Sequence, residues 1–356
     1  MVYSCRKASG WREDVVFESD KYLKHGGGLG GWRVDPDNIN LYEGFIGSYA
    51  KLSLTYESDI YNAFAGVIRR FKVDLKANLC HGIPDAYFDW FLLWTPSSNQ
   101  TRRRSAPSWS WAGWTGGGCG TRLGLLCSSS IKSIRRAIRT RTWVIWYQRR
   151  SHDSEEVNRV WSPSSSKHED FYGSDVPNRF PFDCSKTLPT PRTLDPRFAP
   201  KYTEDTFNPS PGSGFLQFWT VSAMFYLDKP TSKDPPARDT VQALGFSRTG
   251  IFGCDGREVG IVQMPPDWAE ANVPKLHEFI FLCEGGDPMV PRTEEEIVWK
   301  YQIMLIEWGA HQWAERVAVS SIEKKDLNQG FGTGHVGGRL VKSTYPGAVW
   351  KEIILG

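Results

Sequence analysis

The most distinctive segment of the chain is Pro107-Ser108-Trp109-Ser110-Trp111-Ala112-Gly113-Trp114. In an extended strand, Trp109 and Trp111 would lie on one side, and Trp114, which follows Gly113, on the other. Two interpretations are open: the rings stack on a sugar, as in a lectin-like platform, or they pack in a core against neighbouring helices. Because burying an indole removes on the order of 150–250 Å² from water, folding energetics favour the core.

Tryptophan is abundant throughout the chain, with 16 Trp against 5 Met in 356 residues. A chain of this length can bury a core without metals or disulfides. The 40% of apolar residues exclude wholesale disorder. The net charge of +3, from 43 basic and 40 acidic residues, is too small to imply a polyanionic partner by itself.

The cysteines and the N-terminal residues bear on the compartment. None of the seven cysteines has C-x-x-C spacing, so neither a disulfide framework nor a zinc ribbon is indicated. The sequence MVYSCRKASGWREDVV has no apolar signal-peptide region, and the longest apolar run, 215–227, is too short to span a bilayer. We therefore expect a cytoplasmic protein with no membrane partner.

Helical patterns dominate the first part of the chain. Asp59 can cap a helix whose apolar face is Ile60, Phe64, Val67, Ile68 and Phe71. A second helix is predicted with Pro84 in its first turn and an apolar stripe at Ile83, Tyr87, Phe88, Phe91 and Leu92. A short third helix is predicted at Ile131, Ile134 and Ile138, and a strand at 142–147.

Strand patterns dominate the last part of the chain. Strands are predicted at 215–227, 251–254, 257–263, 277–283, 301–308, 316–322 and 349–355. Asp255-Gly256 is predicted to form a two-residue hairpin turn. The fold class is therefore α+β, with N-terminal helices packed on a mostly antiparallel sheet or sandwich formed largely by the C-terminal half.

Nine prolines between Pro163 and Pro211 suggest the internal boundaries. We predict a helix-rich region at 1–161, a Pro/Ser-rich loop or linker at 162–214, and a β-rich region at 215–356. The early strands need partners in the later sheet, so the first and last regions are expected to form one intimate unit.

Sequence motifs for catalysis and cofactor binding are absent. Two G-x-G-x-x-G clusters begin at Gly26 and Gly332, but neither lies between a strand and a helix as a dinucleotide site requires. The seven histidines show no H-x-x-x-H spacing, and no carboxylate pair stands out as a general acid and base. We expect no enzymatic activity, no catalytic residues, no cofactor and no metal.

Basic residues gather in one acid-free stretch. Between Trp90 and His152 there is no Asp or Glu, while eleven residues are Arg or Lys. With Trp143, Trp146 and Tyr147 nearby, such a stretch offers phosphate contacts and stacking for nucleic acid. The sequence contains no recognisable nucleic-acid-binding fold, so the solvated face of a small helix is favoured and nucleic acid is disfavoured as a partner.

Several blocks in order resemble fungal heterokaryon-incompatibility (HET) domain proteins. The blocks are Tyr3-Ser4-Cys5-Arg6 with Trp11-Arg12-Glu13-Asp14, Tyr49 to Gly66, Gly82 to Trp94, Arg103-Arg104 with Pro107 to Trp114, Thr142 to Tyr147, Met304 to Trp308, Glu315-Arg316-Val317 and Trp350 to Gly356. They are similar to the region that follows the family's conserved core, although Lys51 stands where the family often has Arg.

The family's core, with its W-I-D-x-x-C-I-N-Q motif, has no counterpart in this sequence. In the family that core is related to TIR domains and is thought to trigger cell death. The resemblance therefore implies the C-terminal portion of such a protein, starting just downstream of the core and without its effector activity. TIR kinship also raises NAD cleavage, but no residue of this chain can be assigned to it.

The leading hypothesis is a non-enzymatic scaffold or regulator that contacts other incompatibility or death-pathway proteins. The alternative is a β-rich module that binds a glycan or other ligand through an aromatic platform. The residues singled out from the family-like blocks, as structural or interaction residues, are Asp59, Gly66, Pro84, Asp89, Trp94, Arg103, Arg104, Pro107, Ser108, Trp109, Ser110, Trp111, Gly113, Trp114, Trp143, Glu307, Trp308, Glu315 and Arg316.

Overall fold

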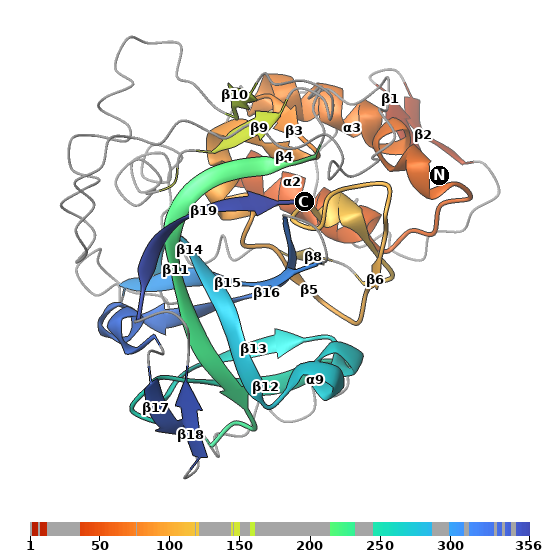
Figure 1. The fold of residues 1–356 in the computed structure, drawn as a ribbon. Helices are drawn as coiled ribbons and strands as arrows, with labels where there is room; N and C mark the ends of the chain where they lie inside the picture. Colours follow the sequence, from red (N-terminus) through yellow and green to blue (C-terminus); the bar gives the residue numbers. More distant parts are fainter. Residues whose placement is uncertain are drawn as a thin grey trace.

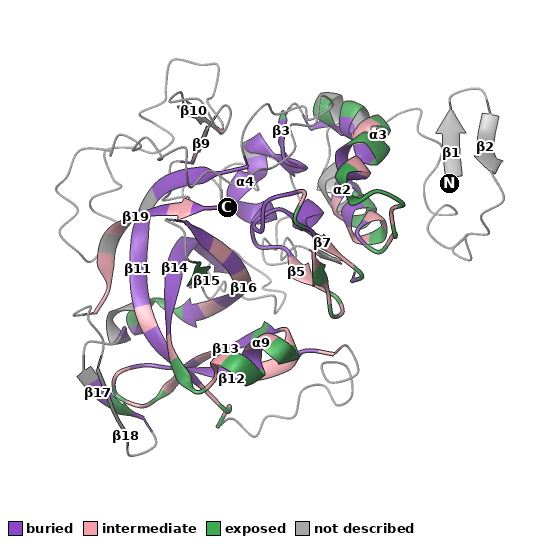
Figure 2. Ribbon diagram, turned by 45° about the vertical axis from the view of Figure 1, so that its right-hand side comes forward, coloured by how far each residue is buried: buried purple, intermediate pink, exposed green. Residues whose placement is uncertain are grey.

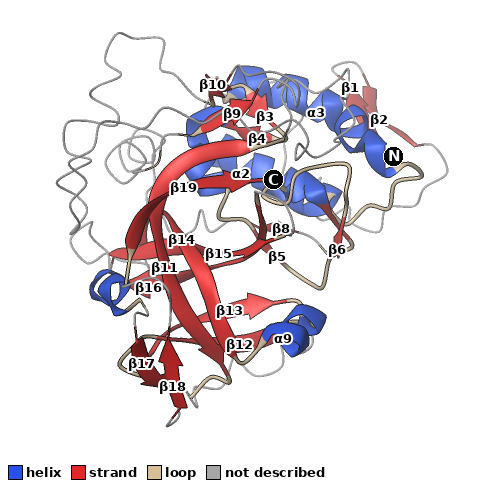
Figure 3. Cartoon of the chain, viewed as in Figure 1, coloured by secondary structure: helices blue, strands red, loops and turns tan. Residues whose placement is uncertain are grey.

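The computed structural model describes residues 2–5, 8–12, 36–75, 77–117, 119–120, 144, 146–149, 157–160, 214–231, 245–286, 299–309, 313–330, 333–336, 339–342 and 347–356 (Figure 1). Helices α2 (Pro36–Tyr49), α3 (Ile60–Asp74) and α4 (Phe88–Phe91) gather at one end of the molecule, and a large sheet with helix α9 (Pro266–Asn272) at its side forms the other end (Figure 3). The predicted α+β class is confirmed: most of the sheet comes from the C-terminal half, and its strands are mostly antiparallel.

Two long helices lie in the described residues of the N-terminal part. After the hairpin of β1 (Val2–Cys5) and β2 (Ala8–Arg12) come α2 (Pro36–Tyr49), a 3₁₀ turn (Glu57–Asp59) and α3 (Ile60–Asp74). The apolar face predicted for α3 is confirmed, since Ile60, Phe64, Ile68 and Phe71 are buried and Val67 packs against them. Their spacing of three and four residues places them on one side of the helix.

The second predicted helix is much shorter than the pattern indicated. Pro84 lies in the two-residue strand β4 (Ile83–Pro84), which pairs with β3 (Leu79–Cys80). A 3₁₀ turn (Asp85–Tyr87) and α4 (Phe88–Phe91) follow. Since nearly every described residue from 79 to 94 is buried, a helical stripe does not distinguish one face here.

The tryptophan segment is not an extended strand. Ser108 and Trp109 lie in a turn, Trp111–Gly113 form a 3₁₀ turn, and only β7 (Trp114–Thr115) is extended. Ser110 favours this local turn because its side chain accepts a hydrogen bond from the backbone N–H of Ala112. Short pairings of β6 (Thr101–Arg102) with β7, and of β5 (Thr95–Pro96) with β8 (Cys119–Gly120), frame the segment.

The nine-stranded sheet confirms the seven C-terminal strand predictions, with small shifts in their ends. Its strands are β9 (Tyr147–Arg149), β10 (Val157–Arg159), β11 (Leu216–Asp228), β12 (Ser247–Phe252), β13 (Glu258–Met264), β14 (Lys275–Gly286), β15 (Trp299–Trp308), β16 (Ala314–Glu323) and β19 (Val349–Leu355). Helix α9 (Pro266–Asn272) follows β13, and a 3₁₀ helix (Lys324–Gln329) and the hairpin of β17 (Thr333–Val336) and β18 (Arg339–Lys342) follow β16.

Five of these strands close into a ring in the order β11, β14, β15, β16, β19 and back to β11. Strand β11 is long and curved, so its first part pairs with β19 and its second part with β14 (Figure 1). Ser222 is paired on both sides, with Ile280 and with Val349. The ring closes between β16 and β19 through a single parallel pair, Ala314 with Leu355. A closed ring leaves fewer free strand edges than an open sheet.

One hydrophobic core joins the helices to the sheet. The same contiguous cluster contains buried side chains from α2, α3, the 79–94 segment, the tryptophan segment and the sheet. The strands are purple along most of their length in Figure 2, while the outer sides of α2 and α3 are green. The boundaries at 161/162 and 214/215 stay predictions, because residues 161–213 lie outside the described ranges. The helix predicted near Ile131 lies outside them too, and so do Gly26 and Gly332, at which the two glycine clusters begin.

The hairpin between β12 and β13 has a three-residue turn rather than the predicted two-residue turn. Gly256 N–H donates to Gly253 O, and Gly253 N–H donates to Arg257 O. Only Gly256 has a positive φ, of 77°. A turn followed by a left-handed glycine is the usual geometry of three-residue hairpins. The Asp-Gly signal was therefore right about the turn and wrong about its length.

A pair of glycines gives the first test of the packing. Gly82 has φ of 78°, and a Cβ there would lie 2.8 Å from Nε1 of Trp111. Gly66 lies in α3, where a Cβ would meet nothing within 4 Å. We expect Gly82→Ala to lower the free energy of unfolding by roughly 2 kcal/mol or more, through backbone strain and the clash.

The matched change Gly66→Ala should raise the free energy of unfolding by about 0.5–1 kcal/mol, because Ala is the better helix former. Urea unfolding of both variants checks this pair. Equal effects at the two positions would contradict the tight contact between Gly82 and Trp111.

Burial of His277 in β14 makes the stability depend on pH. Its Nε2 lies 2.8 Å from Asn272 O, and its ring centroid lies 5.0 Å from that of Trp268. Burial lowers the pKa of His277, although the hydrogen bond to Asn272 acts in the opposite direction. Below about pH 6.5, the ordinary histidine pKa, the unfolded chain therefore binds more protons than the folded one.

We expect the stability that depends on neutral, buried His277 to be fully present above about pH 6.5 and to be lost as the pH falls below that value. His277→Gln should reduce the fall in Tm between neutral and mildly acidic buffer, as measured by calorimetry. His335→Gln, at an exposed histidine, is the matched control and should leave the fall unchanged. An identical pH profile for wild type and His277→Gln would exclude His277 as its source.

Candidate functional site

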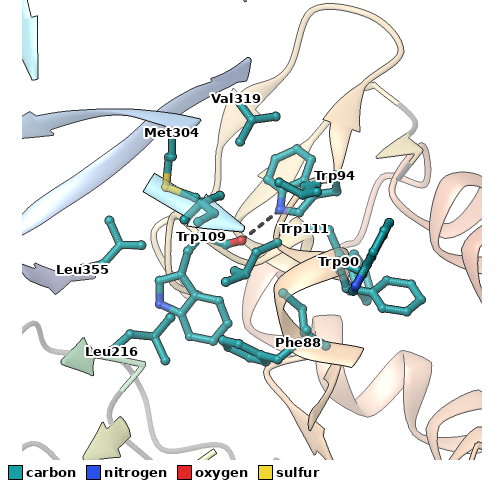
Figure 4. Close-up of a cluster of buried hydrophobic side chains, with 14 of the residues drawn as sticks. Phe88, Trp90, Trp94, Trp109, Trp111, Leu216, Met304, Val319 and Leu355 are labelled. Atoms are coloured by element: carbon teal, nitrogen blue, oxygen red, sulfur yellow. Dashed lines mark hydrogen bonds between the residues drawn. The ribbon is translucent and has the colours of Figure 1, made fainter. Parts of the chain in front are cut away.

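The family-like residues meet where the tryptophan segment lies between the helices and the sheet. We call this region the junction and define it as Trp94, Arg103, Ser108, Trp109, Trp111, Trp114, Arg316 and Gly356. Figure 4 shows Trp109 beside Leu216 and Phe88, with Leu355 and Met304 of the sheet nearby. The ring centroid of Trp109 is 5.4 Å from that of His81 and 5.7 Å from that of Phe88.

Trp111 packs against the helices. Its ring centroid is 5.1 Å from that of Phe64 in α3 and 6.2 Å from that of Tyr49 in α2. Trp109 and Trp111 are 0% and 1% exposed, while Trp114 is half-buried. Two rings of the predicted three-ring platform therefore lie in the core, as the packing interpretation expected.

Each indole N–H of the junction donates to a backbone carbonyl. Trp94 donates to Trp109 O at 2.8 Å (dashed line in Figure 4), and Trp109 donates to Gly214 O at 2.8 Å. Trp111 donates to Gly82 O at 2.9 Å, and Trp114 to Ser108 O at 2.7 Å. A buried N–H without an acceptor costs free energy, so these bonds allow the burial of Trp94, Trp109 and Trp111 and the partial burial of Trp114.

Ser108 connects the segment to the last strand and to β16. Its backbone N–H donates to Gly356 O at 3.0 Å, and its hydroxyl donates to the same oxygen. The Ser108 Oγ also accepts from the backbone N–H of Arg316 at 2.9 Å. Gly356 N–H donates to Ala314 O at 2.9 Å, and a Cβ on Gly356 would lie 2.9 Å from the ring of Trp313. These hydrogen bonds therefore hold the tryptophan segment, strand β16 and the residue after β19 in fixed positions relative to one another.

Arg316 is buried and reaches from β16 into the helical part. Its Nη1 donates to Leu92 O at 2.9 Å, and its Nη2 donates to Trp94 O. Its guanidinium carbon lies 3.7 Å from the centroid of the Trp94 ring. The two carbonyls follow α4, where peptide dipoles favour a cation. Arg316 is thus a structural cation that joins the sheet to the helical part.

Arg102 and Arg103 stabilise the tryptophan segment, while Arg104 lies on the surface. Arg103 is 1% exposed, and its Nη1 donates to Ala112 O at 2.9 Å and to Trp114 O at 3.2 Å. Burial lowers the pKa of Arg103, while the nearby Glu57 raises it. Arg104 forms an exposed ion pair with Glu315 at 2.9 Å, and Nε of Arg102 lies 3.8 Å from the same carboxylate.

The remaining predicted residues lie apart from the junction or serve the backbone. Asp59 ends the 3₁₀ turn before α3, and Gly66 is exposed on α3. Asp89 is buried and accepts from the indole N–H of Trp146. A Cβ on Gly113 would lie only 2.3 Å from the carbonyl oxygen of Pro107, so the close approach of these two backbone segments requires glycine at position 113. Trp143 lies outside the described residues.

Glu307 and Trp308 form separate polar contacts. Glu307 accepts from the indole N–H of Trp268 at 2.8 Å. Trp308 donates at 2.7 Å to Glu278, a carboxylate that is only 7% exposed. Ser222 donates to Glu278 at 2.5 Å and Lys351 at 2.8 Å, so the charge is fully compensated. Sequence reasoning missed this group, whose only signal was one acidic residue within the apolar run 277–283.

A pocket opens at one side of the junction, between β7 and the strands β13 and β16. Its volume is about 40 Å³. Trp94, Trp114, Phe246 and Met264 line it, together with Gln100 and Arg316. The chain segments that form it come from both the helical part and the sheet.

The described residues show few features of a reaction centre. Within them, no group of three or more His, Cys, Asp or Glu residues is placed to hold a metal ion. Cys80 and Cys283 are buried, and burial raises the pKa of both thiols well above the ordinary value. A buried protonated thiol is a poor nucleophile. No helix among the described residues is long and apolar enough to cross a membrane.

The chain was compared with family models, curated proteins and solved structures, and none of them matches it.

The role of Arg316 can be tested by exchanging it for lysine. A lysine has no planar fork, so it cannot donate to both Leu92 O and Trp94 O while stacking on the indole. We expect Arg316→Lys to reduce the free energy of unfolding by roughly 2–4 kcal/mol, as measured by urea unfolding. The same change at exposed Arg104 should have almost no effect, and similar losses at both positions would contradict the structural role of Arg316.

Proposed function

We propose that this protein is a non-enzymatic scaffold or regulator of the HET type, acting through contacts with other proteins of fungal non-self recognition and programmed cell death. The proposal includes a cytoplasmic location, since non-self recognition after cell fusion takes place between merged cytoplasms. It also includes the absence of effector chemistry in these 356 residues, since none of them matches the motifs of the family's core.

One observation carries the proposal: the side chains of the family-like blocks are used for internal contacts. Ser108, Trp109, Trp111 and Arg316 all have their polar groups bonded to backbone within the junction. Side chains used in this way are not free to bind a substrate or transfer a proton. They instead build a rigid body, whose outer surface is then the part that meets partners.

The alternative of an aromatic platform has weaker support. Trp109 and Trp111 are buried, so only Trp114 of the three rings has an exposed part. A lectin-like platform needs several exposed ring faces on one surface.

Expression in a filamentous fungus tests the proposed function. The full chain is induced alone and together with an incompatibility protein that carries the HET core, and cell death is scored with a vital dye. We expect no death from the chain alone, because effector chemistry is absent, and a changed death rate when the core-bearing protein is present. Cellular NAD⁺ is measured in parallel.

Two variants make the test specific. Arg316→Ala should abolish the effect on the death rate by disrupting the junction, and Arg104→Ala should retain it. Death or loss of NAD⁺ on expression of the chain alone would show effector activity and overturn the non-enzymatic proposal. An unchanged death rate with the core-bearing protein would overturn the regulatory role.

A further inference from the structure

Helix α9 covers a buried histidine of the sheet. His277 in β14 is 9% exposed, and it pairs with Phe225 of β11. Its Nε2–H donates at 2.8 Å to the carbonyl of Asn272, the last residue of α9, and its ring centroid is 5.0 Å from that of Trp268. Because a carbonyl can only accept, Nε2 carries the proton of the neutral ring, and Nδ1 is the atom that gains a proton in acid. Helix α9 therefore limits the access of water to the ring.

The attachment of α9 to the sheet is slight. The helix has seven residues, of which only Ala269 is buried, and its N-cap is Pro265, whose side chain cannot accept a hydrogen bond. A helix of this length is not stable by itself in water. The indole N–H of Trp268 donates to the carboxylate of Glu307 at 2.8 Å, but this contact is exposed. Since β14 pairs with β11 on one side and with β15 on the other, local opening removes α9 before it disturbs the sheet.

The groups around His277 act on its charge in both directions. Burial favours the neutral ring and lowers the pKa of His277. The hydrogen bond to the carbonyl at the end of α9 raises the pKa, Lys275 on the same strand lowers it, and Glu307 on β15 raises it. The charged residues of α9 itself, Asp267 and Glu270, are exposed. Because burial is the largest of these effects, the ring takes up a proton more readily when α9 is open than when it is closed.

We propose that α9 is a pH-sensitive lid, which is closed over His277 at neutral pH and opens locally in mild acid while the sheet stays folded. Opening lets water reach the imidazole, so the open form gains a proton at Nδ1 that the closed form binds more weakly. The preference for the closed form is complete above about pH 6.5 and falls as the pH drops below that value. This device goes beyond the scaffold role and does not depend on it.

Hydrogen exchange of the full chain, followed by mass spectrometry, tests the lid. Rates are measured in neutral and in mildly acidic buffer and are corrected for the intrinsic effect of pH on amide exchange. We expect the amides of α9 to lose protection in acid, while the amides of residues 278–283 in β14 keep theirs. An NMR titration of the His277 ring should give a midpoint below about 6.5, the ordinary histidine value.

Three variants assign the effect to the charge on His277. His277→Gln keeps an N–H donor for Asn272 O but cannot be protonated, so the corrected exchange of α9 should be equal in the two buffers. His335→Gln, at an exposed histidine, is the matched control and should leave the loss of protection unchanged. Glu307→Gln keeps an acceptor for Trp268 but removes a carboxylate that favours the charged ring, so the loss in acid should be larger.

Four results would overturn the proposal. They are unchanged protection of α9 in acid, equal losses in α9 and in residues 278–283, a loss that persists in His277→Gln, and a His277 midpoint at or above about 6.5. If His277→Gln does not fold, the exchange and the titration of the wild-type protein still decide between the lid and a static helix. None of these results affects the scaffold proposal, whose readout is cell death.

Discussion

A buried indole N–H must find an acceptor, and in this protein the acceptors are backbone carbonyls of distant segments. Trp109 reaches Gly214, and Trp111 reaches Gly82 in the turn between β3 and β4. A backbone carbonyl is fixed in position, so each bond sets the register of one segment against another as well as satisfying the ring. Arg316 acts in the same way, since it is bound by the carbonyls of Leu92 and Trp94. The arrangement of helices and sheet depends on these few donors.

The turn at His81-Gly82 shows how closely the parts are fitted. Both residues have positive φ, of 48° and 78°, as a two-residue hairpin turn requires. Such turns are usually exposed, but here Gly82 O accepts from Tyr42 at 2.6 Å and from Trp111, and His81 O accepts from Ser110. The turn is therefore a docking point for α2 and for the tryptophan segment, and its backbone supplies all the acceptors.

The sequence predicted those parts of the fold that have a regular apolar spacing or a continuous run of strand-forming residues. The spacing of Ile60, Phe64 and Ile68 predicted a helix, and the apolar run 277–283 predicted a strand that is buried on both faces. The prediction failed at 83–94, because a helical stripe there does not distinguish one face when every described residue is buried. The strand expected at Trp109–Trp111 failed for a local reason, the Ser110 hydrogen bond to Ala112.

The candidate site was predictable only in part. The blocks named Ser108 and Arg316 without showing that they touch, because the hydrogen bond between them joins residues 208 positions apart. Gly356 as the partner of Ser108 has no local signal, and the only signal of Glu278 is that it is an acidic residue within an apolar run. The pocket at Gln100 has none either, since its walls come from four separate segments.

The order in which the chain is made gives the junction a further consequence. A ribosome releases Trp109 long before Gly214, its acceptor 105 residues later, and before Gly356, which meets Ser108 across 248 residues. The aromatic segment therefore spends most of synthesis without the strands that cover it. Partly made chains with exposed apolar rings are prone to aggregate, so the growing protein needs protection during translation. The tryptophans that stabilise the finished molecule are therefore also exposed apolar surface in its unfinished form.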